Sequence, residues 1–537
     1  MLDEKLADIS RSISSALKDI YGADADTTLK RGTRPGIEFF TPISFELGKS
    51  LGLEPRDVAQ KIASRLKMDG TFSATADGAF LNISLSGALY ADYFSHYHFK
   101  TFPANGKKIN IEFISANPTG PLNVVSGRAA AVGLALSSLY RKFGWEVSRE
   151  YYVNDHGNQM NIFASSLLKA YAERFKGETA EYAENEYTGP FTGEIAEEIG
   201  DIIEKAPGGD RIKKEAVKAV IGRIKGTLKN ISLDFDRWFF ESSLYETGEN
   251  EGYVLDTLRK KGLLYEKDGA LFIKNTALGD SQDWVLKKSS GEYTYLFGDI
   301  MYHIDKFRRG YDKAINIWGP DHLSGAVRLI RALTAFGIPE EFLSVIILQQ
   351  VNLIKDGRKI QMSKRTGNFI GLDEILDSVG ADPTKYFFLS KGTSQHIDFD
   401  FDAFEKESEK SPVFYLQYMF ARINGVLLKK YGVDLDGFLD SEKADELELG
   451  EISPMQKEII YTVYVLEAVC AEALTKNEPA MVMNHMNEIA KKFHRFYQGE
   501  RILGSEREEE LLGFIVKLGG AVRSVLTFMG INAPQRM

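Results

Sequence analysis

The hydrophobic and polar positions along this chain predict alternating strands and helices over its middle part. Short β-rich runs lie at residues 108–114, 146–153, 314–318 and 345–353, and a helix of small residues is expected at 128–143. Strands separated by helical stretches are typical of a parallel sheet that is covered by helices on both faces. The pattern therefore predicts an α/β domain over residues 105–405.

From residue 411 onward the periodicity becomes wholly helical. Ser453-Pro454 followed by Gln456 forms a capping-box pattern, and Gly432 stands where a helix-ending glycine belongs. Apolar residues repeat at spacings of three and four, first at Val413, Leu416, Phe420, Ile423 and Leu427, and later at Val482, Met486, Ile489, Phe493 and Phe496. Residues 406–537 are therefore predicted to form an all-α helical bundle.

The first 104 residues predict a small α/β domain, with a helix at the start, a second helix near Pro55 and a strand at 79–84. A linker is expected at 102–107, where Pro, Asn and Gly gather. We interpret residues 165–288 as an insertion in the sheet domain. Its basic stretch at 211–229 could face phosphate, although a solvated helix face is the favoured interpretation.

Composition narrows the class of protein. The 537 residues are 44% hydrophobic and 26% charged, which excludes collagen-like and largely disordered chains. A net charge of −10 argues against a uniformly basic coat, but not against a local patch that binds nucleic acid. Cys470 is the one cysteine, so we expect no disulfide and no structural zinc. No run approaches the ~18 apolar residues of a membrane span, so a cytoplasmic protein without a membrane partner is expected.

One segment at the end of the first predicted strand of the sheet is suited to bind phosphate. Residues 112–128, EFISANPTGPLNVVSGR, combine a strand, a tight loop and a helix start. Unpaired N–H groups and a partial positive charge favour anions at a helix N-terminus. Gly120 and Gly127 would allow close approach of the backbone. An ordinary strand–helix turn explains this segment equally well.

A second segment, residues 356–368 (DGRKIQMSKRTGN), follows an apolar strand. It gathers Lys359, Lys364 and Arg365 around Ser363, and such a loop could close over a polyphosphate. Alone it is better explained as a basic surface loop. Two such segments, each at a predicted strand end of the same chain, favour a nucleotide site.

With these motifs the chain resembles the arginyl-tRNA synthetases, a family of class I aminoacyl-tRNA synthetases. SANPTGPL at 115–122 corresponds to the lead-in of the family's HIGH signature, and QMSKRTGN at 361–368 corresponds to its KMSKS loop. Further matching blocks are EYYVNDHGNQM (150–160), YTYLFGDIMYHID (293–305), GPDH (319–322), SPVFYLQYMFARI (411–423) and MGINAPQRM (529–537).

The resemblance implies a Rossmann-like catalytic domain and a ligase that activates L-arginine with ATP and Mg²⁺, then transfers it to tRNA(Arg). Activation is expected to require bound tRNA, and the protein is expected to be a monomer. The implied arginine-binding residues are Glu112, Ser115, Asn117, Asn154, Tyr295 and Asp299. The implied ATP-binding residues are Pro118, Gly120, Asn123, Ser126, Gly127, Asp321, His322, Met362, Ser363 and Lys364. Among these, Asn123, Ser126, Ser363 and Lys364 are the implied catalytic residues, and Arg422, Tyr497 and Met537 the implied tRNA-binding residues.

The chain departs from the family pattern in the HIGH tetrapeptide, where Asn123-Val124-Val125-Ser126 lacks both histidines. Asn123 and Ser126 can still donate hydrogen bonds to phosphate oxygens, although neither carries charge. We therefore expect an active variant. The alternative is a catalytically impaired paralogue that binds tRNA.

Overall fold

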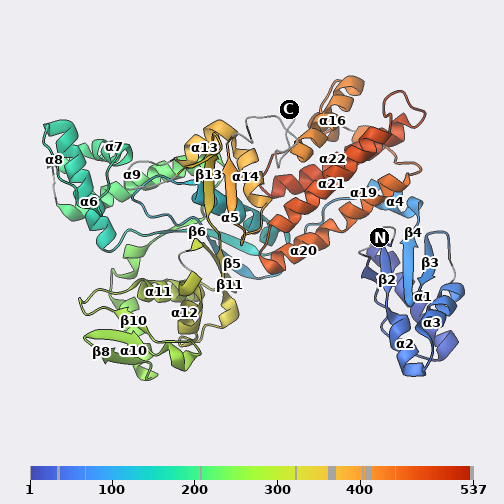
Figure 1. Ribbon diagram of the computed structural model, residues 1–537, viewed down its shortest axis with the longest axis horizontal. Coiled ribbons are helices and arrows are strands. Elements are labelled where there is room, and N and C mark those ends of the chain that lie inside the picture. Colours follow the sequence, from blue (N-terminus) through green and yellow to red (C-terminus); the bar gives the residue numbers. More distant parts are fainter. Residues whose placement is uncertain are drawn as a thin grey trace.

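The computed structural model describes residues 2–32, 37–66, 68–205, 208–320, 323–360, 370–401, 404, 414–441 and 443–532. Figure 1 shows the parallel sheet near the centre of an elongated molecule, with the N-terminal module at one end. The C-terminal helices lie between them. Helix α19 (Pro454–Tyr464) packs on α4 (Gly87–Ser95) of the module, and α20 (Leu466–Lys476) and α22 (Glu508–Phe528) pack on α5 (Val124–Lys142) of the central domain. The predicted fold class is confirmed.

The N-terminal module is an antiparallel sheet of order β1-β2-β4-β3, packed against helices. The expected first helix, the helix from Pro55 and the strand near 79–84 are confirmed, while β1, β2, α2, β3 and α4 were not expected. The elements are α1 (Leu2–Tyr21), β1 (Lys30–Arg31), β2 (Phe39–Thr41), α2 (Ile43–Leu51), α3 (Pro55–Arg65), β3 (Phe72–Asp77), β4 (Phe80–Leu85) and α4 (Gly87–Ser95).

The central sheet is wholly parallel, with the order β12-β11-β5-β6-β7. Its strands are β5 (Lys108–Glu112), β6 (Glu146–Val153), β7 (Arg237–Phe240), β11 (Lys313–Trp318) and β12 (Leu343–Ile347). The chain builds from β5 toward β7, then returns to the other side of β5 for β11 and β12. This reversal creates a switch point between β5 and β11, where ligands bind in open α/β sheets.

The prediction of a single strand at 345–353 is wrong. It is split between β12 and β13 (Val351–Lys355), which belongs to a separate sheet with β14 (Arg358–Ile360) and β15 (Ile397–Asp400). The backbone changes partner at the break: Leu348 N–H bonds the Trp318 carbonyl, whereas Gln349 N–H bonds the Thr393 carbonyl. An apolar run alone does not reveal such a change of sheet.

The segment 165–288 is not one insertion, because it contributes β7 to the central sheet through parallel pairing with β6. Before β7 lies a helical lobe of α6 (Asn158–Tyr171), α7 (Pro190–Glu198), α8 (Gly200–Lys205) and α9 (Gly209–Asn230). After β7 lies a second lobe with α10 (Glu249–Lys260), β8 (Leu264–Lys267), β9 (Ala270–Ile273) and β10 (Trp284–Lys287). The chain then forms α11 (Tyr295–Arg308) and α12 (Leu323–Thr334).

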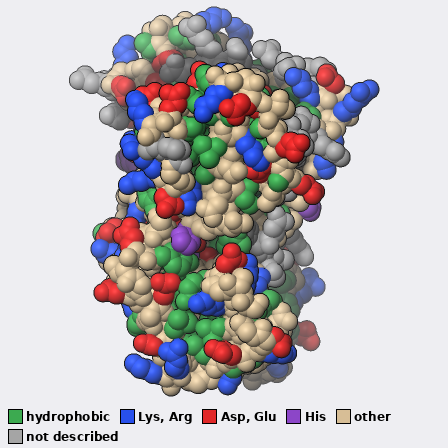
Figure 2. All heavy atoms as spheres, turned by 90° about the vertical axis from the view of Figure 1, so that its left-hand side faces the viewer, with side chains coloured by type: hydrophobic (Ala, Val, Ile, Leu, Met, Phe, Trp, Pro, Cys, Tyr) green, Lys and Arg blue, Asp and Glu red, His purple; other side chains and the backbone are tan. Residues whose placement is uncertain are grey.

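The basic stretch 211–229 lies on α9, and several of its cations have partners. Arg223 bonds Glu194 at 2.5 Å and Glu198 at 3.1 Å, and Lys213 pairs with Asp210 at 2.6 Å. Figure 2, which looks onto this end of the molecule, shows blue and red side chains interspersed over the visible surface. These ion pairs favour a solvated helix face over a surface that binds phosphate.

The C-terminal part is helical as predicted. The capping box at Ser453 and Gln456 is present, and Gly432 and Gly530 end helices with positive φ. Phe493 and Phe496 are buried core residues. The helices are α13 (Leu372–Val379), α14 (Ala381–Leu389), α16 (Phe414–Tyr431), α17 (Leu435–Leu439), α18 (Lys443–Glu446), α19 (Pro454–Tyr464), α20 (Leu466–Lys476), α21 (Ala480–Gly499) and α22 (Glu508–Phe528).

One helix, α22, is long and apolar enough to cross a membrane by length and composition, contrary to the expectation that no run would qualify. In its most apolar window 67% of the residues are buried inside the protein. It packs against α16, α17 and α5. These contacts are those of a core helix.

Candidate functional site

A cavity of about 690 Å³ lies at the switch point between the carboxyl ends of β5 and β11. The start of α11, the segments that follow β6 and β7, and residues of β10 and α12 form the rest of its walls. All of the residues that the resemblance assigns to arginine line this one cavity: Glu112, Ser115, Asn117, Asn154, Tyr295 and Asp299. Tyr295 and Asp299 lie one turn apart on α11 and share the pocket, as their spacing predicted.

Three carboxylates face this cavity, and one of them was missed by sequence reasoning. Glu112 and Glu241 are buried, and Asp299 is partly buried. Burial, together with the negative charges of Glu112 and Glu241, raises the pKa of Asp299 to about 7. Burial, together with Asp155, also raises the pKa of Glu241 to about 7. A cation that enters the cavity would stabilise both ionised forms.

Aromatic rings form much of the remaining wall. They are Tyr152, Trp284, Tyr295, Tyr302 and Trp318. The Arg328 guanidinium lies 4.1 Å from the centre of the Trp284 ring, so this wall already accommodates a planar cation within the protein. Guanidinium groups stack on aromatic faces and bond carboxylates with matching geometry. The cavity is therefore suited to a flat, positively charged side chain.

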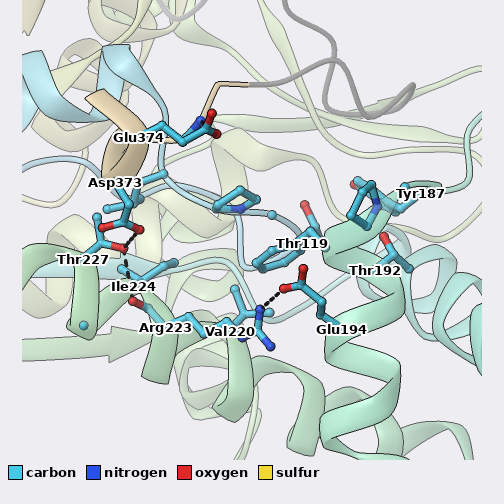
Figure 3. Close-up of a pocket in the computed structure, with 18 of the residues that line it drawn as sticks. Thr119, Tyr187, Thr192, Glu194, Val220, Arg223, Ile224, Thr227, Asp373 and Glu374 are labelled. Carbon is cyan, nitrogen blue, oxygen red and sulfur yellow. Dashed lines mark hydrogen bonds and ion pairs between the residues drawn. The ribbon is translucent and has the colours of Figure 1, made fainter. Parts of the chain in front are cut away.

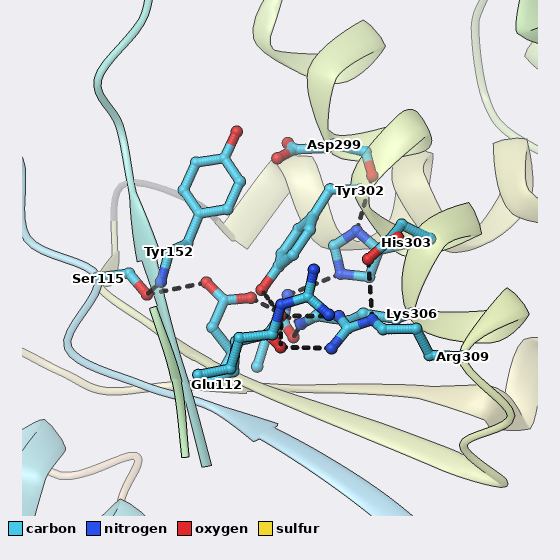
Figure 4. A network of polar contacts seen from close by, with 12 residues as sticks. Glu112, Ser115, Tyr152, Asp299, Tyr302, His303, Lys306 and Arg309 are labelled. Carbon is cyan, nitrogen blue, oxygen red and sulfur yellow. Dashed lines mark hydrogen bonds and ion pairs between the residues drawn. The ribbon is translucent and has the colours of Figure 1, made fainter. Parts of the chain in front are cut away.

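A buried polar network supports the cavity from beneath (Figure 4). Lys306 Nζ donates to Glu112 Oε2 at 2.8 Å and to Asn316 Oδ1 at 2.9 Å. The Asn316 amide in turn donates to His303 Nε2 at 2.8 Å, and His303 Nδ1 donates to the Asp299 backbone carbonyl at 2.7 Å. Burial and the nearby Lys306 lower the pKa of His303 to about 3, so this imidazole stays neutral.

A second buried ion pair lies beside this network. Arg309 bonds both carboxylate oxygens of Glu150, at 2.6 and 2.9 Å, and the Tyr302 hydroxyl donates to Glu150 at 2.7 Å. Asp155, on the loop after β6, accepts from the backbone N–H and the hydroxyl of Ser242. These contacts fix the elements that present Tyr302 and Glu241 to the cavity.

The helix after the motif loop begins earlier than expected, with α5 running from Val124 to Lys142. Asn123 is its N-cap: Oδ1 accepts from Ser126 N–H at 2.9 Å and from Ser126 Oγ at 3.1 Å. The sequence prediction began this helix at residue 128, where the small residues start, and so missed Asn123 as the N-cap. Arg128 is fully buried and donates to the carbonyls of Gln349, Gly392 and Thr393, so its charge serves the packing of the loops.

The residues assigned to ATP do not line one common cavity in the described structure, unlike those assigned to arginine. Pro118 and Gly120 are buried in the motif loop, and Gly120 lines a second cavity instead of the first. A Cβ on Gly127 would lie 2.7 Å from Leu372 Cδ1, so this glycine permits close packing of α5 on α13. Five further assigned residues lie outside the described residues: Asp321, His322, Met362, Ser363 and Lys364.

The second cavity, of about 670 Å³, lies between the motif loop, α7, α9 and the start of α13 (Figure 3). Its polar groups are largely engaged with each other. Thr227 donates to Asp373 at 2.6 Å and Asn230 donates to Asp373 at 3.3 Å, while Arg223 is bonded to Glu194. The bonds to Asp373 join α9 of the helical lobe to α13.

The assigned tRNA-binding residues of the helical bundle lie together, apart from Met537, which is outside the described residues. The Arg422 guanidinium lies 4.1 Å from the Tyr418 ring centre and 4.7 Å from that of Tyr497. His494 contacts the same guanidinium at 3.4 Å. These two rings, together with a hydrogen bond from Arg422 Nη2 to the Tyr418 hydroxyl at 2.9 Å, hold the guanidinium in place.

Over the described ranges, no group of three or more His, Cys, Asp or Glu side chains is arranged to hold a metal ion.

Comparison with protein-family models confirms the resemblance inferred from the sequence. The model described as class I tRNA synthetases (R), catalytic domain, matches residues 94–385. The DALR anticodon-binding domain matches residues 416–537, and the arginyl-tRNA synthetase N-terminal domain matches residues 7–85. Together these three matches extend over most of the chain.

Curated relatives and a solved structure agree with these matches. Arginine–tRNA ligase 1 of Halalkalibacterium halodurans is 35% identical over 526 residues, covering 93% of this chain and 92% of that protein. Arginine–tRNA ligase of Aquifex aeolicus is 32% identical, covering 98% and 99%. The Thermus thermophilus arginyl-tRNA synthetase structure shares the fold, with a TM-score of 0.73 at 19% identity over 99% of this chain and 100% of that one.

Proposed function

This chain belongs to the class I arginyl-tRNA synthetase family, and we propose from that membership that it is an arginine–tRNA ligase. In the first step an arginine carboxylate oxygen attacks the α-phosphorus of ATP, and pyrophosphate leaves. In the second step a hydroxyl at the tRNA 3′ end attacks the arginyl carbonyl, and AMP leaves. The observation that carries the proposal is the switch-point cavity, where three carboxylates and aromatic rings meet.

Arginine recognition is assigned to the cavity walls. Asp299 and Glu241 are proposed to receive the guanidinium, because both carboxylates are desolvated and ionise more readily beside a cation. Glu112, Ser115, Asn117 and Asn154, at the ends of β5 and β6, are proposed to hold the α-amino and carboxylate end near the motif loop. Positioning and charge stabilisation then supply most of the catalysis.

ATP recognition is assigned to the motif loop and the basic loop. Asn123 uses its amide oxygen to cap α5, which leaves its amide N–H groups as the donors that can face a phosphate. Ser363 and Lys364 are proposed to bind the phosphates, with Lys364 offsetting the charge of the leaving pyrophosphate. Bound Mg²⁺ would supply further neutralisation of phosphate charge.

The proposal is tested by pyrophosphate exchange measured with each of the twenty amino acids, in the presence and absence of tRNA. We expect exchange with arginine only, and only when tRNA is present. Exchange with another amino acid and none with arginine would rule the proposal out. A tRNA-bound protein with no exchange at all would indicate a binding paralogue.

We predict that arginine binds more weakly as the pH falls through about 7. Protonation of Asp299 and Glu241, whose pKa values both lie at about 7, removes the charges that face the guanidinium. The substrate guanidinium stays charged throughout. The KM for arginine should therefore rise between pH 8 and pH 6, and the Glu241→Gln variant should show a shallower rise. A flat profile over this range would contradict the assignment.

We predict that Arg422 contributes to tRNA binding through a phosphate. Arg422→Gln should weaken tRNA binding and reduce the slope of log K against log salt by about one. Filter binding at several salt concentrations measures both. Arg523→Gln is the control, because Arg523 is an arginine of the same bundle that pairs with Asp436 at 2.7 Å. Equal slopes for wild type and Arg422→Gln would remove Arg422 from the interface.

Two further expectations from the sequence remain predictions. The protein should sediment as a monomer, and it should be found in the cytoplasm. Analytical ultracentrifugation at micromolar concentration checks the first, and cell fractionation checks the second.

A further inference from the structure

Two consecutive non-glycine residues adopt positive φ where β5 leaves the sheet. The φ angle is 70° at Ile114 and 37° at Ser115. L-residues seldom occupy this region, and a β-branched residue such as isoleucine is an outlier there. A strained bend of this kind persists only where surrounding contacts determine it, and such bends are concentrated at functional sites.

The contacts that hold this bend come from β5 and β6. Ser115 Oγ donates to Glu112 Oε1 at 3.0 Å and accepts from the Tyr152 backbone N–H at 3.1 Å. The Tyr151 hydroxyl donates to the Ala116 carbonyl at 2.8 Å. Figure 4 shows Ser115 between Tyr152 and Glu112. The side chain of Glu112 thus ties the end of β5 to the bend that follows it.

Glu112 is itself held by Lys306, whose side chain is 0% exposed. The Lys306 ammonium lies 2.8 Å from Glu112 Oε2 and 4.3 Å from the Tyr302 ring centre, and it also donates to Asn316. It stands below the cavity, and no step of the proposed reaction uses it. A fully buried ammonium that holds one carboxylate requires a role, since burying an ion pair gives little stability by itself.

We propose that Lys306 is a positioning residue: through Glu112 and Ser115 it fixes the strained bend at Ile114–Ser115 and so aims the loop 115–123 at the arginine cavity. The inference rests on the proposed function, because this loop carries Asn117 and Asn123 and leads into the first turn of α5, which carries Ser126. Without Lys306, the buried Glu112 carboxylate would lose its charged partner and turn toward water. Ser115 would then lose its acceptor, and the bend would relax toward ordinary φ.

The first test removes the ammonium. Lys306→Met keeps the apolar stem, and we expect the kcat of arginine-dependent pyrophosphate exchange to fall roughly 10²-fold, the loss that follows a small misplacement of reacting groups. The KM for ATP should change much less. Lys306→Arg, which keeps the charge, should retain most of the activity. Full activity of Lys306→Met would overturn the proposal.

A sharper test asks whether relieving the backbone strain at Ile114 makes the contacts of Lys306 with Glu112, and of Glu112 with Ser115, unnecessary. In the Lys306→Met background, Ile114→Gly should restore the rate by about tenfold, because glycine adopts positive φ freely. Ile114→Ala is the matched control: it removes the same packing and keeps the strain, so it should restore nothing. Equal rates for the two double variants would contradict a role in holding the bend.

The remaining variants separate this role from general stability. If Lys306→Met does not fold, Lys306→Gln replaces it in the same comparison, because it removes the charge and keeps a polar side chain at the buried position. Lys385→Met should leave exchange unchanged, since Lys385 is a buried lysine paired with Asp382 at 2.8 Å and does not line the cavity. A general effect of losing a buried lysine would lower exchange in this control too.

A readout independent of activity is thermal unfolding of the single variants. Glycine normally destabilises relative to alanine, yet Ile114→Gly should have the higher Tm of the two because it relieves the strain. A lower Tm for Ile114→Gly would count against the proposal. Should the wild type exchange with another amino acid, the proposed function fails, and the variants are then assayed with that amino acid.

Discussion

Replacing Asp299 with asparagine is expected to raise the KM for arginine by about 10²-fold to 10³-fold and to leave the KM for ATP within about twofold. The carboxylate lies in the cavity wall at a position where burial has already raised its pKa to about 7. A guanidinium that enters would keep its charge and lose one of the two carboxylates proposed to face it, which is a large penalty for a desolvated ion. Steady-state pyrophosphate exchange with tRNA present measures both constants.

Asp305→Asn provides the matched control for this prediction. Asp305 lies on the same helix, α11, and pairs with Arg309 at 2.8 Å without lining the cavity. The KM of the Asp305→Asn variant for arginine should remain close to that of the wild type. Similar, small changes in both variants would remove Asp299 from the arginine site.

The largest loss of stability is expected for Glu150→Gln. Glu150 is fully buried, and Arg309 bonds both of its oxygens. Removing the charge of Glu150 leaves Arg309 with only the partly exposed Asp305 as a charged partner, so we expect the free energy of unfolding to fall by about 3 kcal/mol. Burial raises the pKa of Glu150. The hydrogen bonds from Arg309 and the charge of Lys306 lower it by more than burial raises it, so the net pKa lies below the ordinary value. This contribution is therefore present at neutral pH and is lost as the pH falls through the folded pKa.

Urea unfolding at neutral pH measures this loss, and Glu146→Gln is the control. Glu146 lies on the same strand, β6, and makes an exposed pair with Lys108 at 3.2 Å. Exposed pairs contribute about 0–1 kcal/mol, so this variant should remain near wild-type stability. Comparable losses in the two variants would mean that the Glu150 pair has no special weight in the fold.

The sequence carried the local features of the site but not its supporting contacts. The strand at 146–153 was predicted with its observed bounds, since a β-rich run between turn signals suffices for that. The grouping of Asn117, Tyr295 and Asp299 in one cavity followed from the family motifs. Lys306 was not singled out, because a lysine on a helix gives no local sign that it is buried against another strand.

Glu241 was missed for a different reason. It follows β7, a strand of four residues whose pairing with β6 joins segments far apart in the chain, so 165–288 was interpreted as an insertion. A signal was present: a carboxylate stands directly after the apolar run Trp238-Phe239-Phe240. Side chains just past the carboxyl end of a parallel strand reach the ligand crevice. Without knowledge that the run belongs to the parallel sheet, this rule could not be applied.

Binding of arginine and of citrulline, measured by titration calorimetry on the wild type and on Asp299→Asn, is the most direct test of recognition by buried carboxylates. Citrulline keeps the shape of arginine and replaces the guanidinium with a neutral urea. The wild type should bind arginine about 10²-fold more tightly than citrulline or better, and this preference should largely disappear in Asp299→Asn. Equal affinity of the wild type for arginine and citrulline would contradict recognition of the guanidinium by these carboxylates.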